Sequence, residues 1–303
     1  MKRELLPYIL SAALVLSGNA ALYAGSPRVT SVFPAGGQRG AEGEIECRGG
    51  NLEDAKGLLF DEPGFEATAV AAEKNKFKVK VKVAADARLG EHTFRVITAS
   101  GVADVRLFYV TPFPMVAEVE KDKENKENKD ESPPPQEVPL GVTIYGTTPR
   151  EDQDHFVVEA KKGERISAEV IAARFQTQRI YDPLLTITAP DGKSLISIDD
   201  TAFTRQDPVA SVVAPEDGKY IVTIKEATNS GSGECQYLLN VGKFPRPLAV
   251  YPAGGPAGEE LKFTLLGDAT GPIEKAIKLP DASLDHFEIF PEDGQPAPQP
   301  NFI

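Results

Sequence analysis

The sequence lacks tryptophan, and its 303 residues include only two cysteines, three histidines and two methionines. Cys47 and Cys235 lie far apart in the chain, whereas secreted domains that depend on disulfides carry dense, paired cysteines. We therefore expect two buried free thiols, with a disulfide between them as the alternative. Without tryptophan, sugar binding on aromatic platforms has little support, because the remaining aromatic side chains lie in or beside expected strands.

The arrangements of residues that carry catalysis are also missing. His92, His155 and His286 lie in three separate parts of the chain, so a general base beside a nucleophile would require convergence between domains. The sequence contains no GxSxG elbow, HExxH zinc helix or P-loop. Ser230–Gly233 lacks the spacing of a nucleophile loop and is typical of a hairpin tip. We expect no enzymatic activity.

No long apolar run follows the N-terminal region. Residues 1–24 begin with two basic residues, continue with an apolar stretch at 5–16 and end in small residues, an order typical of a secretory signal peptide. We expect cleavage after Ala24, with Ala20 as the alternative. The apolar stretch is shorter than the roughly 20 residues of a membrane span. The sequence therefore predicts a secreted or periplasmic protein with no membrane span after signal cleavage.

An excess of positive charge is absent as well. Acidic residues number 45 against 33 basic ones, for a formal net charge of -12. Such a surface opposes unspecific binding to nucleic acid or anionic lipid, so we expect no nucleic-acid partner. The 26 glycines and 25 prolines favour short strands over long helices, and the length suits two or three domains.

One motif occurs twice. Residues Val32–Gly49, VFPAGGQRGAEGEIECRG, recur without a gap as Val250–Gly267, VYPAGGPAGEELKFTLLG, with eight identities. A repeat at a fixed offset is typical of a modular array, in which each copy folds as a unit. We expect related modules at residues 28–114 and 244–303, with an unrelated module between them.

Residues 28–114 contain the clearest strand of the chain. In Lys76–Val83, KFKVKVKV, apolar residues alternate with four lysines, as in a strand with one face in water. The lysines either meet an acidic polysaccharide or another domain, or discourage edge-to-edge pairing of strands. Residues 115–137 are charged and end in three prolines, which predicts a solvated, extended linker that spaces its neighbours apart, with a charged helix as the alternative.

Residues 138–243 hold about eight strand-like runs with Asp-Gly turns and no helical stripe, a pattern that favours a jelly-roll or similar sandwich. Residues 244–303 repeat the opening of 28–114 but are fewer. We expect a partial sandwich whose open edge and exposed apolar face invite association, either from a longer array truncated at Ile303 or as a trimmed fold that closes itself. The expected fold class is all-β, a tandem of sandwiches.

Short motifs occur along the central stretch and along residues 28–114. In the central stretch they are Asp152–Phe156, Lys161–Glu164, Asp182–Leu184, Asp191–Lys193, Asp217–Tyr220 and Gln236–Leu238, and in residues 28–114 they are Pro34–Gly37, Gly49–Leu52 and Phe108–Val110. Through these motifs the central stretch resembles a bacterial pre-peptidase C-terminal (PPC) domain, and residues 28–114 are similar to immunoglobulin-like IPT/TIG domains. The resemblance implies sandwich folds for both, with a partial second Ig-like module at 244–303, and for the PPC type a non-catalytic accessory module of secreted peptidases or large envelope proteins.

Four carboxylates are candidate metal ligands. Asp152 and Asp154 flank one residue at a strand start, and Asp199 and Asp200 end another strand. Hard oxygen ligands that converge from loops suit calcium at extracellular concentrations, and some relatives of the PPC type use calcium. The chain departs from the family at Glu118–Glu120, which lacks the Pro-Asn that often follows and is displaced by the charged insertion at 121–131. The alternative is that these acids are solvated turns or caps, and that no cofactor binds.

The loop at 174–181, RFQTQRIY, is the candidate contact surface, through Arg174, Arg179 and Tyr181; the alternative is an ordinary connection between strands. The sequence favours a secreted, non-catalytic modular protein that acts in adhesion, spacing or accessory binding in the envelope or extracellular space. Its expected partners are other envelope or extracellular proteins or polysaccharide, and the residues specify no oligomeric state. An accessory fragment of a secreted peptidase and a carbohydrate-binding module are the alternatives.

Overall fold

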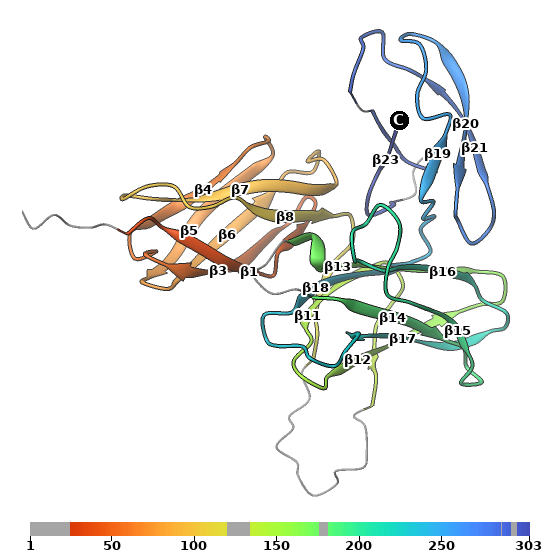
Figure 1. Cartoon of the computed structure of the whole chain (residues 1–303), viewed down its shortest axis with the longest axis horizontal. Coiled ribbons are helices and arrows are strands. Elements are labelled where there is room, and N and C mark those ends of the chain that lie inside the picture. The colour runs from red at the N-terminus through yellow and green to blue at the C-terminus, as the bar shows by residue number, and fades with distance from the viewer. Residues whose placement is uncertain (1–24, 120–133, 176–180, 286, 292–295) are drawn as a thin grey trace, which may run out of the picture.

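The computed structural model describes residues 25–119, 134–175, 181–285, 287–291 and 296–303. The expected signal peptide at 1–24, Arg179 and His286 lie outside these ranges. Within them, every regular element is a β-strand except the single 3₁₀ turn η1 (Ala173–Phe175), which confirms the all-β fold class of tandem sandwiches (Figure 1).

The first sandwich has two four-stranded sheets. In spatial order they contain β1 (Arg28–Phe33), β3 (Glu42–Gly50), β6 (Lys76–Val83) and β5 (Phe65–Glu73), and then β2 (Gly36–Gln38), β8 (Arg106–Thr111), β7 (Gly90–Thr98) and β4 (Ala55–Phe60). The apolar residues of β6 are buried, as the alternation predicts. However, β6 lies between β3 and β5, and its lysines pair with glutamates of those neighbours, such as Lys78 with Glu44. Protection of an edge is therefore not the role of these lysines.

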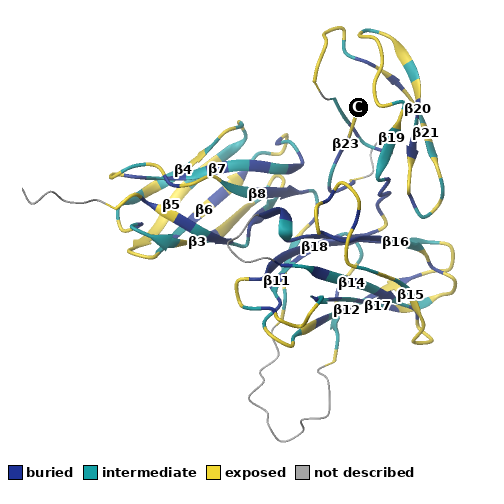
Figure 2. Cartoon of the chain, in the orientation of Figure 1, coloured by how far each residue is buried: buried dark blue, intermediate teal, exposed yellow. Residues whose placement is uncertain are grey.

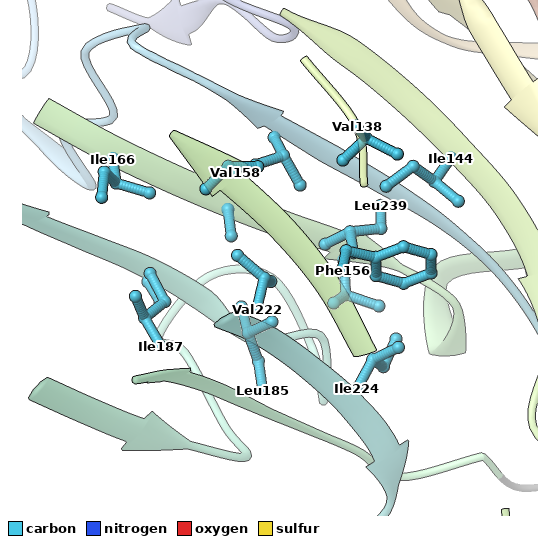
Figure 3. Packing of buried hydrophobic residues seen from close by; sticks show 14 of the residues in the cluster. Val138, Ile144, Phe156, Val158, Ile166, Leu185, Ile187, Val222, Ile224 and Leu239 are labelled. Carbon is cyan, nitrogen blue, oxygen red and sulfur yellow. The ribbon is translucent and has the colours of Figure 1, made fainter. Parts of the chain in front are cut away.

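The central sandwich is the larger one, with two five-stranded sheets. The first contains β10 (Gln136–Glu137), β12 (Gln153–Ala160), β17 (Gly218–Glu226), β14 (Pro183–Thr188) and β15 (Ser194–Ile198), and the second contains β16 (Val209–Val213), β13 (Arg165–Ile171), β18 (Gln236–Gly242), β11 (Val142–Thr147) and β9 (Met115–Ala117). Figure 3 shows side chains of the two sheets, among them Phe156, Val222 and Leu239, packed between them.

The expected linker at 115–137 differs from the structure at both ends. Met115–Ala117 form β9, which pairs in parallel with β11, and Gln136–Glu137 form β10, which pairs in parallel with β12. Because β9 and β10 belong to opposite sheets of the central sandwich, the charged segment starts and ends within that sandwich. Residues 120–133 lie outside the described ranges. The central unit therefore begins before residue 138, the boundary expected from the sequence.

The first and central sandwiches also pack directly on each other, so the expectation that they are spaced apart is wrong. The core of the first sandwich includes Ile171, Phe175 and Leu238 from the central one. The rings of Phe33 and Tyr145 meet edge to face across the boundary, with centroids 5.6 Å apart. Apolar contact of this kind favours a fixed arrangement over independent motion.

The third unit, residues 244–303, repeats the opening of the first sandwich in structure. It consists of β19 (Ala249–Tyr251), β20 (Glu260–Leu266) and β21 (Ile273–Lys278) in one sheet and the pair β22 (Glu288–Ile289) and β23 (Asn301–Phe302). The register Val250 with Leu265 repeats Val32 with Cys47 at the offset of the sequence repeat. Its core is small, and Figure 2 shows much of this unit in the colour of exposed residues.

Candidate functional site

Three carboxylates meet at one end of the central sandwich. The ligand oxygens of Glu118, Asp152 and Asp154 all lie within 4.8 Å of one another. Glu118 follows β9 in one sheet, whereas Asp154 belongs to β12 in the other. Asp154 lies on the inward face of β12 because it is two residues before the buried Phe156 on an alternating strand. The cluster therefore joins the two sheets.

Two hydrogen bonds and a glycine hold this cluster in place. The hydroxyl of Tyr237 donates to Asp154 Oδ2 at 3.0 Å, and the backbone N–H of Thr147 donates to Glu118 Oε2 at 3.0 Å. Gly146 leaves the space that Glu118 fills, since a Cβ at this position would lie 1.9 Å from Glu118 Oε2 and 2.6 Å from the hydroxyl of Tyr237. A larger residue at 146 would displace the Glu118 carboxylate.

The electrostatics of the cluster suit a hard cation. Burial, a hydrogen bond and charge from Glu118, and the charge of Asp152 together raise the pKa of Asp154 to about 10. A bound cation would offset these effects and favour the ionised form of Asp154. Calcium is bound by carboxylate and other oxygens, about 6–8 in all, and three carboxylates supply part of such a set. The donor chemistry fits calcium.

The four predicted ligands do not come together. Asp152 and Asp154 belong to the cluster, whereas Asp199 and Asp200 follow β15 and lie near Asp182 instead. There, burial raises the pKa of Asp182, and the charges of Asp200 and Asp199 add to the increase. Among the described residues, the cluster thus includes two of the four predicted ligands, and calcium binding stays a prediction. The third carboxylate is Glu118, which the sequence did not single out, because Glu118–Glu120 is where this chain departs from the PPC pattern.

The predicted contact surface is also wrong where the structure describes it. Tyr181 is 2 % exposed and belongs to the core of the central sandwich, and Arg174 is 7 % exposed. Arg179 lies outside the described residues. The side chain of Arg174 instead enters a network of buried charges at the junction of all three units.

Glu169, on β13, is the centre of this network and is fully buried. It accepts hydrogen bonds from Arg246 Nε at 2.9 Å and Arg246 Nη2 at 3.0 Å, from Arg174 Nη2 at 3.1 Å, and from the side-chain amide of Gln299. Burial alone raises the pKa of Glu169, but the charges of Arg246 and Arg174 outweigh it and lower the pKa below its usual value. Glu169 is therefore held ionised.

Asp207 fixes the position of Arg174. Its carboxylate accepts hydrogen bonds from the backbone N–H groups of Ala172, Ala173 and Arg174, at 3.0, 2.7 and 3.3 Å, and from Arg174 Nε at 2.6 Å. These bonds shape the short turn η1 and hold the guanidinium over Glu169. A charged residue in a polar loop is thus drawn inward by two buried carboxylates.

Further contacts link the first sandwich and the third unit to the same place. The hydroxyl of Tyr109, on β8, donates to the carbonyl of Pro298 at 2.8 Å. Arg88 Nη1 lies 3.2 Å from Glu288 Oε1. The backbone N–H of Arg246 donates to Asp268 Oδ2 at 2.8 Å. Side chains of all three units therefore meet around the junction, which we call the Glu169 junction, formed by Glu169, Arg174, Asp207, Arg246, Gln299 and Tyr109.

No protein-family model and no curated protein matches this chain. Among the part of the chain that the structure describes, no helix combines the length and the apolar character needed to cross a membrane.

The solved structures that match this chain include three bacterial proteins. One is the pre-peptidase C-terminal domain of a Bacillus anthracis collagenase, at 14% identity over 37% of this chain and 99% of that domain, with a TM-score of 0.28. Another is PliG of Aeromonas hydrophila, a periplasmic inhibitor of g-type lysozyme, at 14% identity, 35% and 96% coverage and a TM-score of 0.27. A third is SGBP-B of the Bacteroides ovatus mixed-linkage glucan utilization locus, solved with a heptasaccharide, at 10% identity, 71% and 74% coverage and a TM-score of 0.25. At these values the likeness assigns no function to this chain.

Proposed function

We propose that this chain is an exported, non-catalytic scaffold that holds three β-sandwich units in a fixed arrangement, for adhesion, spacing or accessory binding in the envelope or extracellular space. The Glu169 junction is the observation that carries this proposal. Buried ions are costly unless each is paired, so the junction stabilises only the arrangement that pairs them all. Domains that move independently could not keep Glu169 paired at once with Arg174 of the central sandwich and with Arg246 and Gln299 of the third unit.

The positions of the histidines support a non-catalytic role. His92 lies in the first sandwich, where its Nε2 is 2.8 Å from the carbonyl oxygen of Arg88, and His155 lies in the central one, where its Nδ1 is 2.9 Å from Thr223 Oγ1. Both rings have structural partners, and they lie in separate sandwiches. Export is supported by the order of basic, apolar and small residues at 1–24.

Small-angle X-ray scattering of the mature chain tests the scaffold. We expect a scattering profile that one rigid arrangement of the three units reproduces, and a single unfolding transition. A profile that requires an ensemble of independently moving units would contradict the proposal. Turnover of peptide or glycan substrates by the purified chain would contradict its non-catalytic part, and retention of the unprocessed chain in the cytoplasm of a bacterial host would contradict export.

Calcium binding by Glu118, Asp152 and Asp154 is part of the same proposal. A divalent cation would offset two of the three carboxylate charges and tie the end of β9 to the start of β12. The position of Glu118, where the charged segment begins, would then depend on bound calcium. Isothermal titration with calcium chloride, before and after treatment with a chelator, tests this part directly, and absence of a saturable heat would contradict it.

Carbohydrate binding is the second candidate function, and Phe203 is the residue that favours it. Its side chain is 88 % exposed, and the loop around it is held by hydrogen bonds from Thr204 Oγ1 to the carbonyls of Thr201 and Asp207. An exposed aromatic ring on a braced loop can stack on a sugar ring. Retardation on polysaccharide gels that is lost in Phe203→Ala would support this function, and equal mobility on all gels would contradict it.

A further inference from the structure

The two copies of the repeated motif differ in one structural respect. In the first sandwich, the turn that begins at Pro34 leads into β2, which pairs in parallel with the last strand, β8. Ala35 O accepts a hydrogen bond from Tyr109 N at 2.9 Å, and Arg39 N donates to Thr111 O at 2.8 Å. The repeat offset places Ala253 and Ala257 at the positions of Ala35 and Arg39.

The backbone on both sides of this turn is the same in the two copies. Val83 N donates to Ala41 O at 2.9 Å, and at the corresponding place Leu279 N donates to Glu259 O at 2.8 Å. Gly40 and Gly258 also correspond, with φ angles of 78° and 76°. The chain therefore leaves this turn with the same hydrogen bond and the same glycine conformation in the third unit as in the first sandwich.

Only the strand that covers the turn is different. Among the described residues, the backbone groups of Ala253, Gly254, Gly255 and Ala257 form no hydrogen bond, and all four residues are exposed. In the first sandwich, Ala35 is 5 % exposed, and a Cβ at the next residue would lie 2.6 Å from the carbonyl oxygen of Tyr109. At Gly254, by contrast, nothing lies within 4 Å of a Cβ. We name residues Ala253–Ala257 the vacant edge.

We propose that the vacant edge binds an extended peptide segment of a partner protein by parallel strand addition, in the position that β8 takes in the first sandwich. Main-chain hydrogen bonds supply the affinity in this mode of recognition, and alternate side chains supply the specificity. The template is β8 itself, RLFYVT, in which the ring of Phe108 packs on Phe60, Phe65 and Phe94 inside the sandwich, and Val110 lies on the same face of the strand. Tyr109 and Thr111 are also buried, but on the other face, where Tyr109 contacts Pro298 and Thr111 contacts Thr143 of the neighbouring units. The partner segment therefore carries apolar side chains at the positions of Phe108 and Val110.

The sequence of the vacant edge is compatible with this pairing. Pro256 stands where the first copy has Gln38. Because ladder bonds on one side of a strand come from alternate residues, Ala35 and Arg39 face β8, whereas Gln38 does not. Proline at 256 therefore removes no donor that the added strand needs.

A second copy of this chain is not the proposed occupant. Its β8 already lies inside its own sandwich, where Phe108, Tyr109 and Val110 are at most 1 % exposed. The proposal is also independent of the scaffold role, because a strand can add to this edge whatever the remaining units do.

A synthetic peptide of residues 104–112, DVRLFYVTP, labelled with a fluorophore, serves as the probe. We expect a saturable rise in fluorescence anisotropy with the full mature chain, and slower hydrogen exchange at Gly255 and Ala257 in the complex. Ala257→Pro removes the N–H that corresponds to that of Arg39 and should weaken binding roughly tenfold, the loss of about one hydrogen bond. The matched variant Pro256→Gln should bind the peptide as the parent does. Circular dichroism verifies that both variants fold.

Three outcomes would overturn the proposal. One is the absence of saturable binding by the probe peptide. Another is binding that leaves hydrogen exchange at the vacant edge unchanged, or that Ala257→Pro leaves intact. The third is a concentration-dependent dimer in sedimentation, with the vacant edge protected in the absence of peptide, because the occupant would then be a second copy of this chain.

Discussion

Arg246 Nε and Nη2 reach the two carboxylate oxygens of Glu169 at 2.9 and 3.0 Å, although the residues are 77 positions apart in the chain. The pair joins a strand of the central sandwich to the segment that leads into the third unit. A guanidinium and a carboxylate that meet through two parallel hydrogen bonds fix both distance and orientation. The pair therefore sets how the third unit lies against the central sandwich.

Replacing Glu169 with glutamine should destabilise the protein strongly. The substitution keeps the shape of the side chain but leaves Arg174 and Arg246 buried without their shared anion, at a cost of about 3–5 kcal/mol. Urea unfolding monitored by circular dichroism measures the change. Glu164→Gln is the matched control, because Glu164 pairs with Lys243 near the surface, and we expect little change there. Equal stabilities of the two variants would contradict the role of the junction.

The hydroxyl of Tyr109 should matter for the third unit more than for its own sandwich. Tyr109→Phe keeps the buried ring but removes the donor to Pro298, which leaves a buried carbonyl without this partner at a cost of about 1–3 kcal/mol. We expect faster hydrogen exchange at 296–303 with unchanged exchange in β6. Uniform loss of protection throughout the first sandwich would show instead that the ring packing was disturbed.

Stability should fall as the solution becomes acidic because of His92. Burial lowers the pKa of His92 below its usual 6.5, and the nearby charge of Arg88 also lowers it, whereas the Arg88 carbonyl and the charges of Glu62 and Glu288 oppose the decrease. The unfolded chain therefore binds a proton at His92 at a higher pH than the folded chain does. The contribution of neutral His92 to the free energy of unfolding is present above about pH 6.5. It is lost as the pH falls from there toward the pKa of His92 in the folded chain.

Comparing urea unfolding of the parent and His92→Gln between pH 7.5 and 5 isolates this effect. The parent should lose more stability over that interval than the variant, which has no group titrating at position 92. Parallel curves would contradict a buried neutral imidazole.

Calcium should raise the melting temperature of the parent, and Asp154→Asn should remove that rise. The reason is that Asp154 is the buried member of the carboxylate cluster. Asp200→Asn serves as the control, because Asp200 lies outside the cluster, and its response to calcium should match that of the parent. A calcium response that survives in Asp154→Asn, or that is lost in Asp200→Asn, would place the cation elsewhere.

Gly146→Ala should weaken calcium binding without unfolding the central sandwich. The added methyl group would occupy the place of Glu118 Oε2, and its 2.6 Å contact with the hydroxyl of the buried Tyr237 also requires a shift of that ring, so urea unfolding of the variant is measured beside its affinity. Gly233→Ala, where nothing lies within 4 Å of a Cβ, is the matched control. Isothermal titration measures both affinities. An unchanged affinity in Gly146→Ala would exclude Glu118 as a ligand.

Local patterns in the sequence predicted much of the fold. The alternation in Lys76–Val83 specified a strand with one buried face, and the repeat specified that β1 with β3 and β19 with β20 share one register. Both features depend on side chains close together in the chain, where the period of two and a fixed offset carry the information.

Features that depend on distant partners were predicted less well. Arg174 lies in a polar loop that has the composition of a surface, and only Asp207 and Glu169 draw its guanidinium inward. Asp199 and Asp200 form an acidic pair like Asp152 and Asp154, yet the partner that completes the cluster, Glu118, lies on the far side of the charged segment. The composition of residues 115–137 is that of a spacer. The strand pairing at its ends involves only two or three residues on each side, too few to change that composition.

The attachment of β9 and β10 to opposite sheets has a consequence for proteolysis. A single cut anywhere between 120 and 133 would divide the covalent chain, but the N-terminal fragment would keep its pairing to β11 and the C-terminal fragment its pairing to β12. The nicked protein would therefore run as two polypeptides after denaturation and as one particle before it. Processing in this segment would convert a single chain into a noncovalent heterodimer without releasing either half.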